Sequence, residues 1–116
     1  MSEVGIYHNP KCSKSRETLA LLRSRGIEPK VISYLETPPD AGELGRILRL
    51  LKMEPKALMR KKEEEYQSLG IDEKPWRRAE LISFMVKHPT LIERPIVVKG
   101  RRAALGRPPE EVLKIL

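Results

Sequence analysis

The stretch that decides the fold runs from residue 4 to residue 16 and reads VGIYHNPKCSKSR. Its first four residues are apolar or small and predict a short β-strand, and the polar residues after Cys12 lead into a segment with helical spacing. Cys12 therefore stands where a strand turns into a helix. A side chain at this point faces the unpaired backbone N–H groups of the first helical turn.

Cys12 is the only cysteine of the chain, and its neighbours favour a reactive thiol. A lone cysteine often packs as a small apolar residue, but the flanks of Cys12 are polar and basic. The helix N-terminus attracts negative charge, and Lys11, Lys14 and Arg16 add positive charge nearby. We therefore expect the pKa of the Cys12 thiol to be lowered.

Length and composition indicate one ordinary domain over residues 1–116. A single cysteine cannot form an internal disulfide, and Met1 to Val4 lacks the charged and apolar regions of a secretion signal. The longest apolar stretch, residues 81–86, is far shorter than the roughly 20 residues that span a bilayer. The sequence predicts a soluble cytoplasmic protein that does not bind membranes.

The charge balance suggests an anionic partner. The chain has 23 Lys and Arg residues against 16 Asp and Glu residues, a net charge of +7. Nucleic acid is the obvious polymeric candidate, but aromatic residues make up only 4% of the chain and the basic residues are dispersed among acidic ones. The charge by itself does not say whether the anion is small or polymeric, but the scarcity of aromatic residues argues against nucleic acid, and we expect no nucleic-acid partner.

The first part of the chain predicts a βαβ unit. The helix after Cys12 ends near Gly26, and the β-branched run 31–35 follows closely as a second strand, parallel to the first. Residues 37–40, Thr-Pro-Pro-Asp, predict the start of another helix, whose apolar side contains Leu44, Ile47, Leu48 and Leu51.

The second part predicts a helical insertion at about residues 53–90, followed by a β-hairpin and a last helix. The insertion is mostly charged and is interrupted near Gly70 and Pro75. Residues 96–98 and 103–105 read as antiparallel strands joined by a tight turn, and a helix opens at Pro108. The order βαβα–ββα indicates an α/β protein with a thioredoxin-like, mixed four-stranded sheet.

This topology draws attention to Pro95, directly before the third strand. Thioredoxin-like proteins have a cis-proline at this place, facing the reactive cysteine, and we therefore predict a cis bond between Arg94 and Pro95, although cis is the minor form before most prolines.

Three arginines lie at element boundaries rather than in charge runs: Arg60, Arg94 and Arg107. The planar guanidinium group suits a tetrahedral oxyanion because it donates paired hydrogen bonds and stays charged. His8 lies four residues before Cys12, where it could hydrogen-bond the loop or help keep the thiol ionised. Two distant histidines and one cysteine offer no closed metal site.

Four segments together resemble the glutaredoxin-coupled arsenate reductase (ArsC) family, nearly end to end. They are residues 6–16, 34–39 (Tyr-Leu-Glu-Thr-Pro-Pro), 93–98 (Glu-Arg-Pro-Ile-Val-Val) and 106–110 (Gly-Arg-Pro-Pro-Glu). The resemblance implies that Cys12 is the nucleophile that attacks arsenate, that Arg60, Arg94 and Arg107 surround the oxyanion, and that His8 influences the thiolate. Pro95 and Arg16 are expected to be structural residues near the site.

Residues 12–16, Cys-Ser-Lys-Ser-Arg, place the chain closer to a less characterised branch of that family than to its well-studied arsenate reductases. The related Spx-type regulators often have a Cys-x-x-Cys motif, but Ser15 occupies the second cysteine position here, which excludes an internal disulfide switch.

The leading hypothesis is an arsenate reductase that binds no cofactor, uses glutathione as co-substrate and is regenerated by glutaredoxin. Two alternatives stay open: a glutathione-dependent thiol oxidoreductase acting on another substrate, and a non-enzymatic module that binds a protein partner as Spx-type relatives do.

Overall fold

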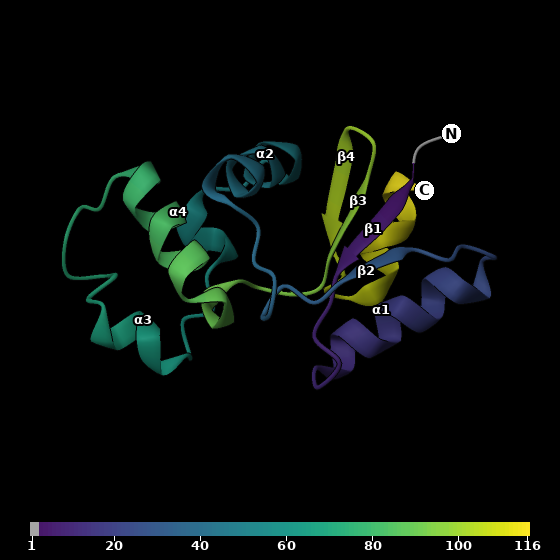
Figure 1. The fold of residues 1–116 in the computed structure, drawn as a ribbon, viewed down its shortest axis with the longest axis horizontal. Coiled ribbons are helices and arrows are strands. Elements are labelled where there is room, and N and C mark those ends of the chain that lie inside the picture. The colour runs from purple at the N-terminus through teal and green to yellow at the C-terminus, as the bar shows by residue number, and fades with distance from the viewer. Residues whose placement is uncertain (1–2) are drawn as a thin grey trace. The chain divides into compact units, whose positions relative to one another are not determined.

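Four short strands form a mixed sheet in the computed structural model, which describes residues 3–116. They are β1 (Val4–Tyr7), β2 (Lys30–Ile32), β3 (Ile96–Lys99) and β4 (Arg102–Leu105), in the spatial order β2-β1-β3-β4 (Figure 1). β1 pairs with β2 in parallel, and the β1–β3 and β3–β4 pairs are antiparallel. This sheet, with its helices, confirms the predicted α/β, thioredoxin-like fold.

Helix α1 (Ser13–Ser24) connects β1 to β2 and confirms the predicted βαβ unit. Gly26, with φ 76°, follows the helix, and its N–H bonds to the Arg23 carbonyl, as is common for glycine at a helix end. β2 is shorter than the predicted strand 31–35. The chain turns at Ser33, whose carbonyl accepts hydrogen bonds from the N–H groups of Glu36 and Thr37.

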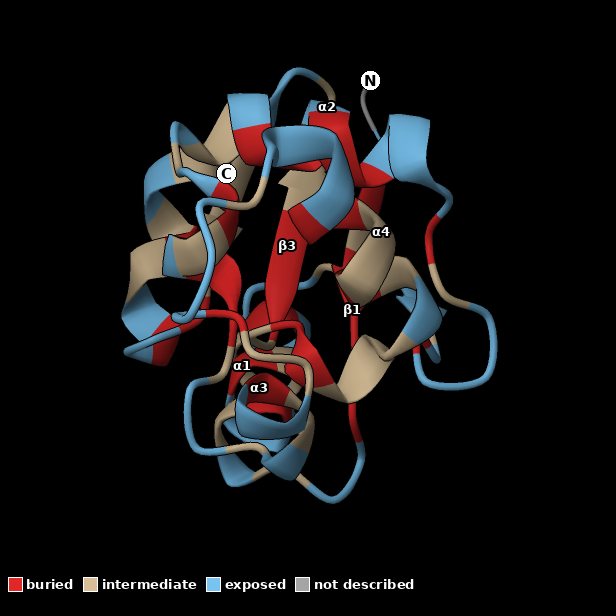
Figure 2. Cartoon of the chain, turned by 90° about the vertical axis from the view of Figure 1, so that its left-hand side faces the viewer, coloured by how far each residue is buried: buried red, intermediate tan, exposed pale blue. Residues whose placement is uncertain are grey.

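One face of the sheet packs on α1 and on the C-terminal 3₁₀ helix η3 (Pro109–Ile115). The buried side chains of this core are Val4, Ile6, Leu22, Val97 and Val112. The buried residues of β1 and β3 run through the centre of the sheet (Figure 2). Full burial of such an apolar side chain stabilises the fold by about 1.5–3 kcal/mol.

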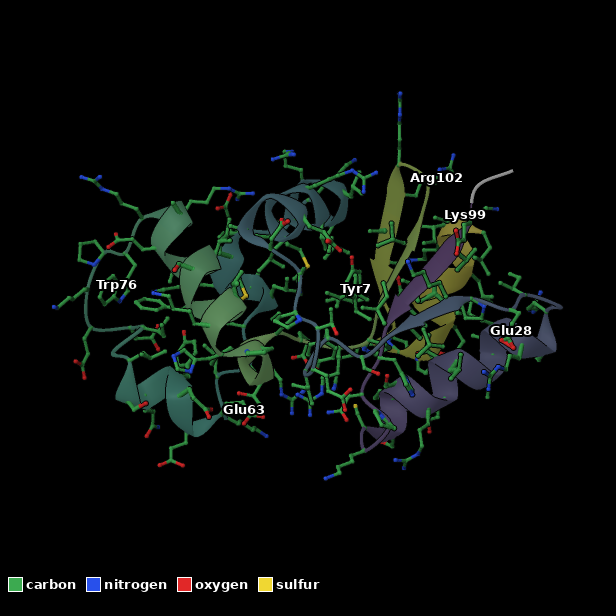
Figure 3. The ribbon with its side chains drawn as sticks, viewed as in Figure 1. Tyr7, Glu28, Glu63, Trp76, Lys99 and Arg102 are labelled. Atoms are coloured by element: carbon green, nitrogen blue, oxygen red, sulfur yellow. The ribbon has the colours of Figure 1, made fainter. Side chains whose placement is uncertain are left out.

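The last helix begins where predicted but winds as a 3₁₀ helix. Pro108 precedes its first turn and Pro109 occupies the first helical position, where the missing N–H has no cost. At the β3–β4 turn, in which Gly100 has φ 58°, Lys99 and Arg102 are paired in register; both are labelled in Figure 3.

The remaining helices form a second compact unit, residues 38–93, distinct from the unit formed by residues 3–37 and 94–116. It contains α2 (Ala41–Leu51), η1 (Pro55–Leu58), α3 (Glu64–Ser68), α4 (Arg78–Lys87) and η2 (Pro89–Leu91). Asp40 caps α2 by accepting a 2.8 Å hydrogen bond from the Glu43 N–H. As predicted, Leu44, Ile47 and Leu48 are buried, and the helices are interrupted around Gly70 and Pro75.

The boundaries of this helical unit differ from the predicted insertion at about 53–90. Helix α2 packs against α4 and so belongs to the helical unit. Residues on either side of Met59 pair with the segment around Ile92: the Arg60 N–H donates to Leu91 and the Glu93 N–H donates to Leu58. Organisation as a single domain stays a prediction. Among residues 3–116, no helix is long and apolar enough to cross a membrane.

Candidate active site

Cys12 is the N-cap residue of α1, with extended backbone angles of φ −94° and ψ 123°. Its N–H donates to the Asn9 carbonyl at 3.0 Å, and its carbonyl accepts the first helical hydrogen bond, from Arg16 N–H at 3.0 Å. The side chain is partly exposed. The strand–turn–helix arrangement predicted for residues 4–16 is confirmed, with the thiol at the helix N-terminus.

Side chains of α1 hold the loop that precedes Cys12. The buried Ser15 hydroxyl accepts a hydrogen bond from the Asn9 N–H at 3.0 Å and shares a 2.6 Å hydrogen bond with His8 Nδ1. Arg16 Nη1 donates to the Pro10 carbonyl at 2.9 Å. Arg16 thereby ties the first turn of α1 to the loop that precedes Cys12, and its structural role at the site stays a prediction.

The pKa of the Cys12 thiol is below its ordinary value. Burial by itself raises this pKa, but hydrogen bonds from the Ser15 N–H, the Arg94 side chain and the Lys14 N–H, with the charge of Arg94, lower it overall. The predicted direction and the predicted role of the helix N-terminus are confirmed. The positive charge that contributes comes from Arg94, whereas we expected it from Lys11, Lys14 and Arg16.

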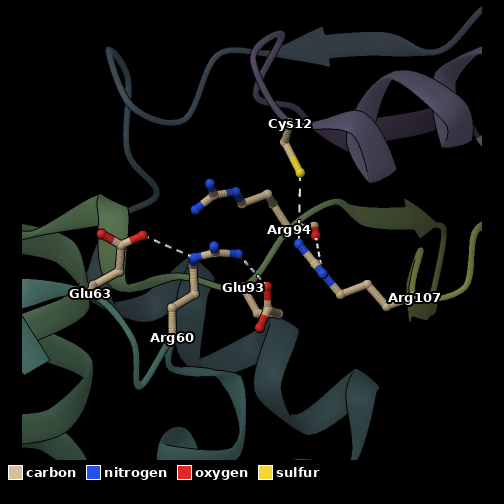
Figure 4. Close-up of polar contacts among 6 residues, drawn as sticks. All are labelled: Cys12, Arg60, Glu63, Glu93, Arg94 and Arg107. Atoms are coloured by element: carbon tan, nitrogen blue, oxygen red, sulfur yellow. Dashed lines mark hydrogen bonds and ion pairs between the residues drawn. The ribbon is translucent and has the colours of Figure 1, made fainter.

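Arg107 joins the thiol to the Arg94 backbone (Figure 4). Arg107 Nη2 lies 3.7 Å from Cys12 Sγ, and its Nε donates to the Arg94 carbonyl at 2.7 Å. That second bond fixes the plane of the Arg107 guanidinium group. Two of the three predicted arginines therefore lie beside the predicted nucleophile.

Close packing around Pro95 positions the segment that carries Arg107. The Arg94–Pro95 bond is cis, as predicted, and the Arg107–Pro108 bond, for which we made no prediction, is also cis. Gly106 N–H donates to the Pro95 carbonyl at 2.9 Å. A Cβ atom on Gly106 would lie 2.7 Å from Pro95 Cγ and would clash with Thr18 Oγ1 of α1, so only glycine fits here without rearrangement.

His8 is buried, and its pKa is lowered, first by desolvation and then by the charges of Arg23 and Arg16. Its ring bonds to the Ser15 hydroxyl of α1, which also holds the loop, whereas a direct hydrogen bond from His8 to the loop and an influence of His8 on the thiolate stay predictions. A lowered pKa keeps the imidazole neutral at pH 7, and a neutral ring supplies no positive charge to a thiolate.

Arg60 lies in the helical unit, between two carboxylates. Its Nη1 is 2.8 Å from Glu93 Oε1 and its Nε is 3.1 Å from Glu63 Oε1 (Figure 4). Its participation in an oxyanion site stays a prediction. In the part of the chain that the structure describes, residues 3–116, no group of three or more His, Cys, Asp or Glu side chains could hold a metal ion.

Sequence reasoning gave no positioning role to Ser15, Thr18 or Gly106. A signal existed for two of them: a polar residue three positions after an N-cap cysteine can reach back to the loop, and a glycine before Arg107 indicates close backbone approach. Thr18 carries no such signal, because its contact with the Gly106 segment depends on how the last strand returns to α1.

Residues 7–115 match the ArsC family, and the chain belongs to that family. It is 51% identical to the uncharacterized protein YfgD of Escherichia coli K12, over 98% of this chain and 97% of that protein. It is 49% identical to an arsenate reductase of Escherichia coli, over 100% of this chain and 82% of the relative. A solved structure of an arsenate reductase from Vibrio cholerae is 54% identical and superposes with a TM-score of 0.96, covering 99% of this chain and 98% of that one.

Proposed function

We propose that the protein is an arsenate reductase in which Cys12 is the nucleophile. The observation that carries this proposal is the convergence of two guanidinium groups, Arg94 and Arg107, on a thiol of lowered pKa. A thiolate beside fixed cations can attack an oxyanion that the cations hold. Relatives about half identical to the chain over its full length are named arsenate reductases, which supports arsenate as the substrate.

The first step is attack of the Cys12 thiolate on As(V). A sulfur–arsenic bond forms, and one arsenate oxygen leaves, after protonation, as water. Arg107 and Arg94 bind the remaining oxygens and offset the charge that the thiolate and the anion bring together.

Reduction uses an external thiol, because the chain has no second cysteine. A glutathione thiolate attacks the Cys12 sulfur, the sulfur–arsenic bond breaks, and the electron pair stays on arsenic, which leaves as arsenite. Cys12 is then a mixed disulfide with glutathione. A glutaredoxin thiolate attacks the glutathione sulfur and releases the Cys12 thiolate, and a second glutathione restores glutaredoxin with formation of glutathione disulfide. Two glutathione molecules thus supply the two electrons.

The test is arsenite formation by the purified protein with arsenate, glutathione, glutaredoxin and a glutathione-recycling system. We expect Cys12→Ser to lower the rate by at least about 1,000-fold, because serine is a far weaker nucleophile, and to leave the circular dichroism spectrum unchanged. Retention of glutathione-dependent activity by Cys12→Ser would contradict the proposal. If the folded wild-type protein, with a Cys12 thiol that can be alkylated, forms no arsenite, the substrate of Cys12 is not arsenate and the proposal is wrong.

A further inference from the structure

A groove of about 570 Å³ runs along the exposed side of α1, with the start of η3 as its other wall. Lys14, Glu17 and Leu21 line it on the α1 side, and Pro108 to Glu110 line it on the other. The volume is within the range of about 300–1,000 Å³ that small-molecule sites occupy. All of these residues belong to the unit that contains the sheet.

One end of this groove adjoins the candidate nucleophile. The backbone N–H of Lys14, a lining residue, hydrogen-bonds Cys12. Pro108, on the opposite wall, directly follows Arg107, whose Nη2 lies 3.7 Å from Cys12 Sγ. Both walls therefore begin close in sequence to the residues around the thiol. Cys12 and Arg107 do not themselves line the groove, so a bound molecule has to extend past Lys14 to reach the sulfur.

The lining combines opposite charges with an apolar surface. Lys14 Nζ and Glu17 Oε2 lie 3.7 Å apart, and their side chains are 45% and 56% exposed, so this pair is weak and open to exchange with a ligand. Glu110 adds a second carboxylate, and the partly exposed Leu21 and the exposed Pro108 supply the apolar surface. A purely anionic ligand does not fit this pattern, because two carboxylates face one ammonium group.

We infer that this α1–η3 groove is the glutathione site of the enzyme. Glutathione has a zwitterionic γ-glutamyl end: its carboxylate pairs with Lys14, and its ammonium group lies between Glu17 and Glu110. The peptide then packs on Leu21 and Pro108 and directs its thiol toward Cys12. The inference rests on the proposed function, which requires a glutathione thiolate to reach the Cys12 sulfur.

Single-turnover kinetics isolate this step. The arsenate-treated protein is mixed with glutathione without glutaredoxin, and the mixed disulfide on Cys12 is followed by mass spectrometry. For Ala20→Trp, which fills the groove from its exposed α1 side, we expect the half-saturating glutathione concentration to rise on the order of tenfold. For Lys14→Gln we expect a rise of about threefold to fivefold, the effect of one exposed charge.

Lys114→Gln is the matched control. It removes a lysine from another i,i+3 pair, Lys114–Glu111 at 2.9 Å, outside the groove lining. Its half-saturating glutathione concentration should equal that of wild type. If Ala20→Trp and Lys14→Gln also match wild type, the glutathione site is elsewhere, although arsenate reduction itself stands. Multiple-turnover kinetics with glutaredoxin added complete the test: if the variants change only the KM for glutaredoxin there, the groove binds that protein and the inference is overturned.

Direct binding provides a readout that needs no arsenate chemistry. Cys12→Ser labelled with ¹⁵N is titrated with S-methylglutathione, which cannot form a disulfide. We expect amide shifts concentrated at residues 14–24 and 110–111 and strongly reduced in Ala20→Trp. Shifts concentrated at other residues, or none at millimolar ligand, would overturn the inference. Because this readout is independent of arsenite formation, a failure of the proposed function is distinguished from a failure of the glutathione site.

Discussion

Arg107 and Arg60 carry the same chemical group but face opposite partners. Arg107 Nη2 faces the Cys12 sulfur, and its Nε is held by a backbone carbonyl. Arg60 faces the carboxylates of Glu63 and Glu93. Burial by itself lowers the pKa of Arg60, but Glu93 and Glu63 raise it overall, so the Arg60 cation is strongly compensated where it stands. The sequence position of an arginine therefore does not by itself show that its guanidinium group is available to bind an anion.

The two compact units also differ in net charge. Residues 1–37 and 94–116 contain 12 Lys and Arg against 6 Asp and Glu, a net charge of +6, whereas residues 38–93 contain 11 against 10, a net charge of +1. Nearly all of the excess positive charge therefore lies in the unit that carries the thiol. A field of this sign attracts anions, such as the arsenate and glutathione of the proposed reaction.

The sharpest test of the comparison is Arg107→Lys. Lysine keeps the charge but loses the planar group that bonds Arg94 and faces Cys12. We expect kcat/KM for arsenate to fall by about 10-fold to 100-fold in the coupled arsenite assay. Arg101→Lys, in the exposed β3–β4 turn, should be unchanged. Equal kinetics for Arg107→Lys and wild type would contradict an oxyanion role.

Gly106→Ala tests the packing that positions Arg107. The new methyl group meets Pro95 and Thr18, and we expect the free energy of unfolding in urea to fall by about 2–3 kcal/mol. Gly42→Ala is the opposite control: it lies in α2, its Cβ has room, and alanine should stabilise the protein by about 0.5 kcal/mol. Destabilisation by Gly42→Ala, or none by Gly106→Ala, would contradict the described packing.

Arg60→Lys completes the pair of arginine substitutions. Because Arg60 already bonds two carboxylates, we expect kcat/KM for arsenate to fall by less than about fivefold. A loss as large as that of Arg107→Lys would instead support the role that the family resemblance implies for Arg60. The decisive quantity is the ratio of the two effects, measured in the same assay.

The smallest change concerns the pH dependence of Cys12 alkylation by iodoacetamide. The thiolate is the reacting form, so the rate should stay high down to a pH below the ordinary cysteine pKa and fall as the pH drops through the lowered pKa. Arg94→Leu should move the midpoint upward, because it removes a hydrogen bond and a positive charge from the thiolate. Lys11→Gln should leave the midpoint in place. If instead Lys11→Gln moves the midpoint and Arg94→Leu does not, the lysine next to Cys12 is the main positive charge that lowers the thiol pKa.

Local patterns were enough to predict much of the sheet unit. The strand, the N-cap cysteine and α1 follow each other within residues 4–24, and their spacing decides their structure. The place of α2 could not be predicted in this way: its apolar side requires a partner but does not say which, and the partner, α4, begins at Arg78. The direction of the pKa shift at His8 was also hidden, because its pKa depends on burial and on Arg23, fifteen residues away.

In the candidate site, too, contacts between residues far apart in sequence could not be predicted. Arg94 and Arg107 could be selected because each stands beside a proline that fixes its backbone. The Glu93 carboxylate beside Arg60 could not be assigned, because Glu93 is 33 positions away along the chain and meets Arg60 only through the pairing around Met59 and Ile92.

Because the chain has a single thiol, a thiol assay measures the concentration of candidate active sites and of protein chains together. Each chain has one sulfhydryl group, partly exposed, so a reagent that releases a coloured thiol counts functional sites and chains on the same scale. Any shortfall from one equivalent measures the fraction already oxidised. Because oxidation can join Cys12 only to another molecule, every lost equivalent appears as an added mass or as a dimer, and non-reducing electrophoresis separates the dimer directly.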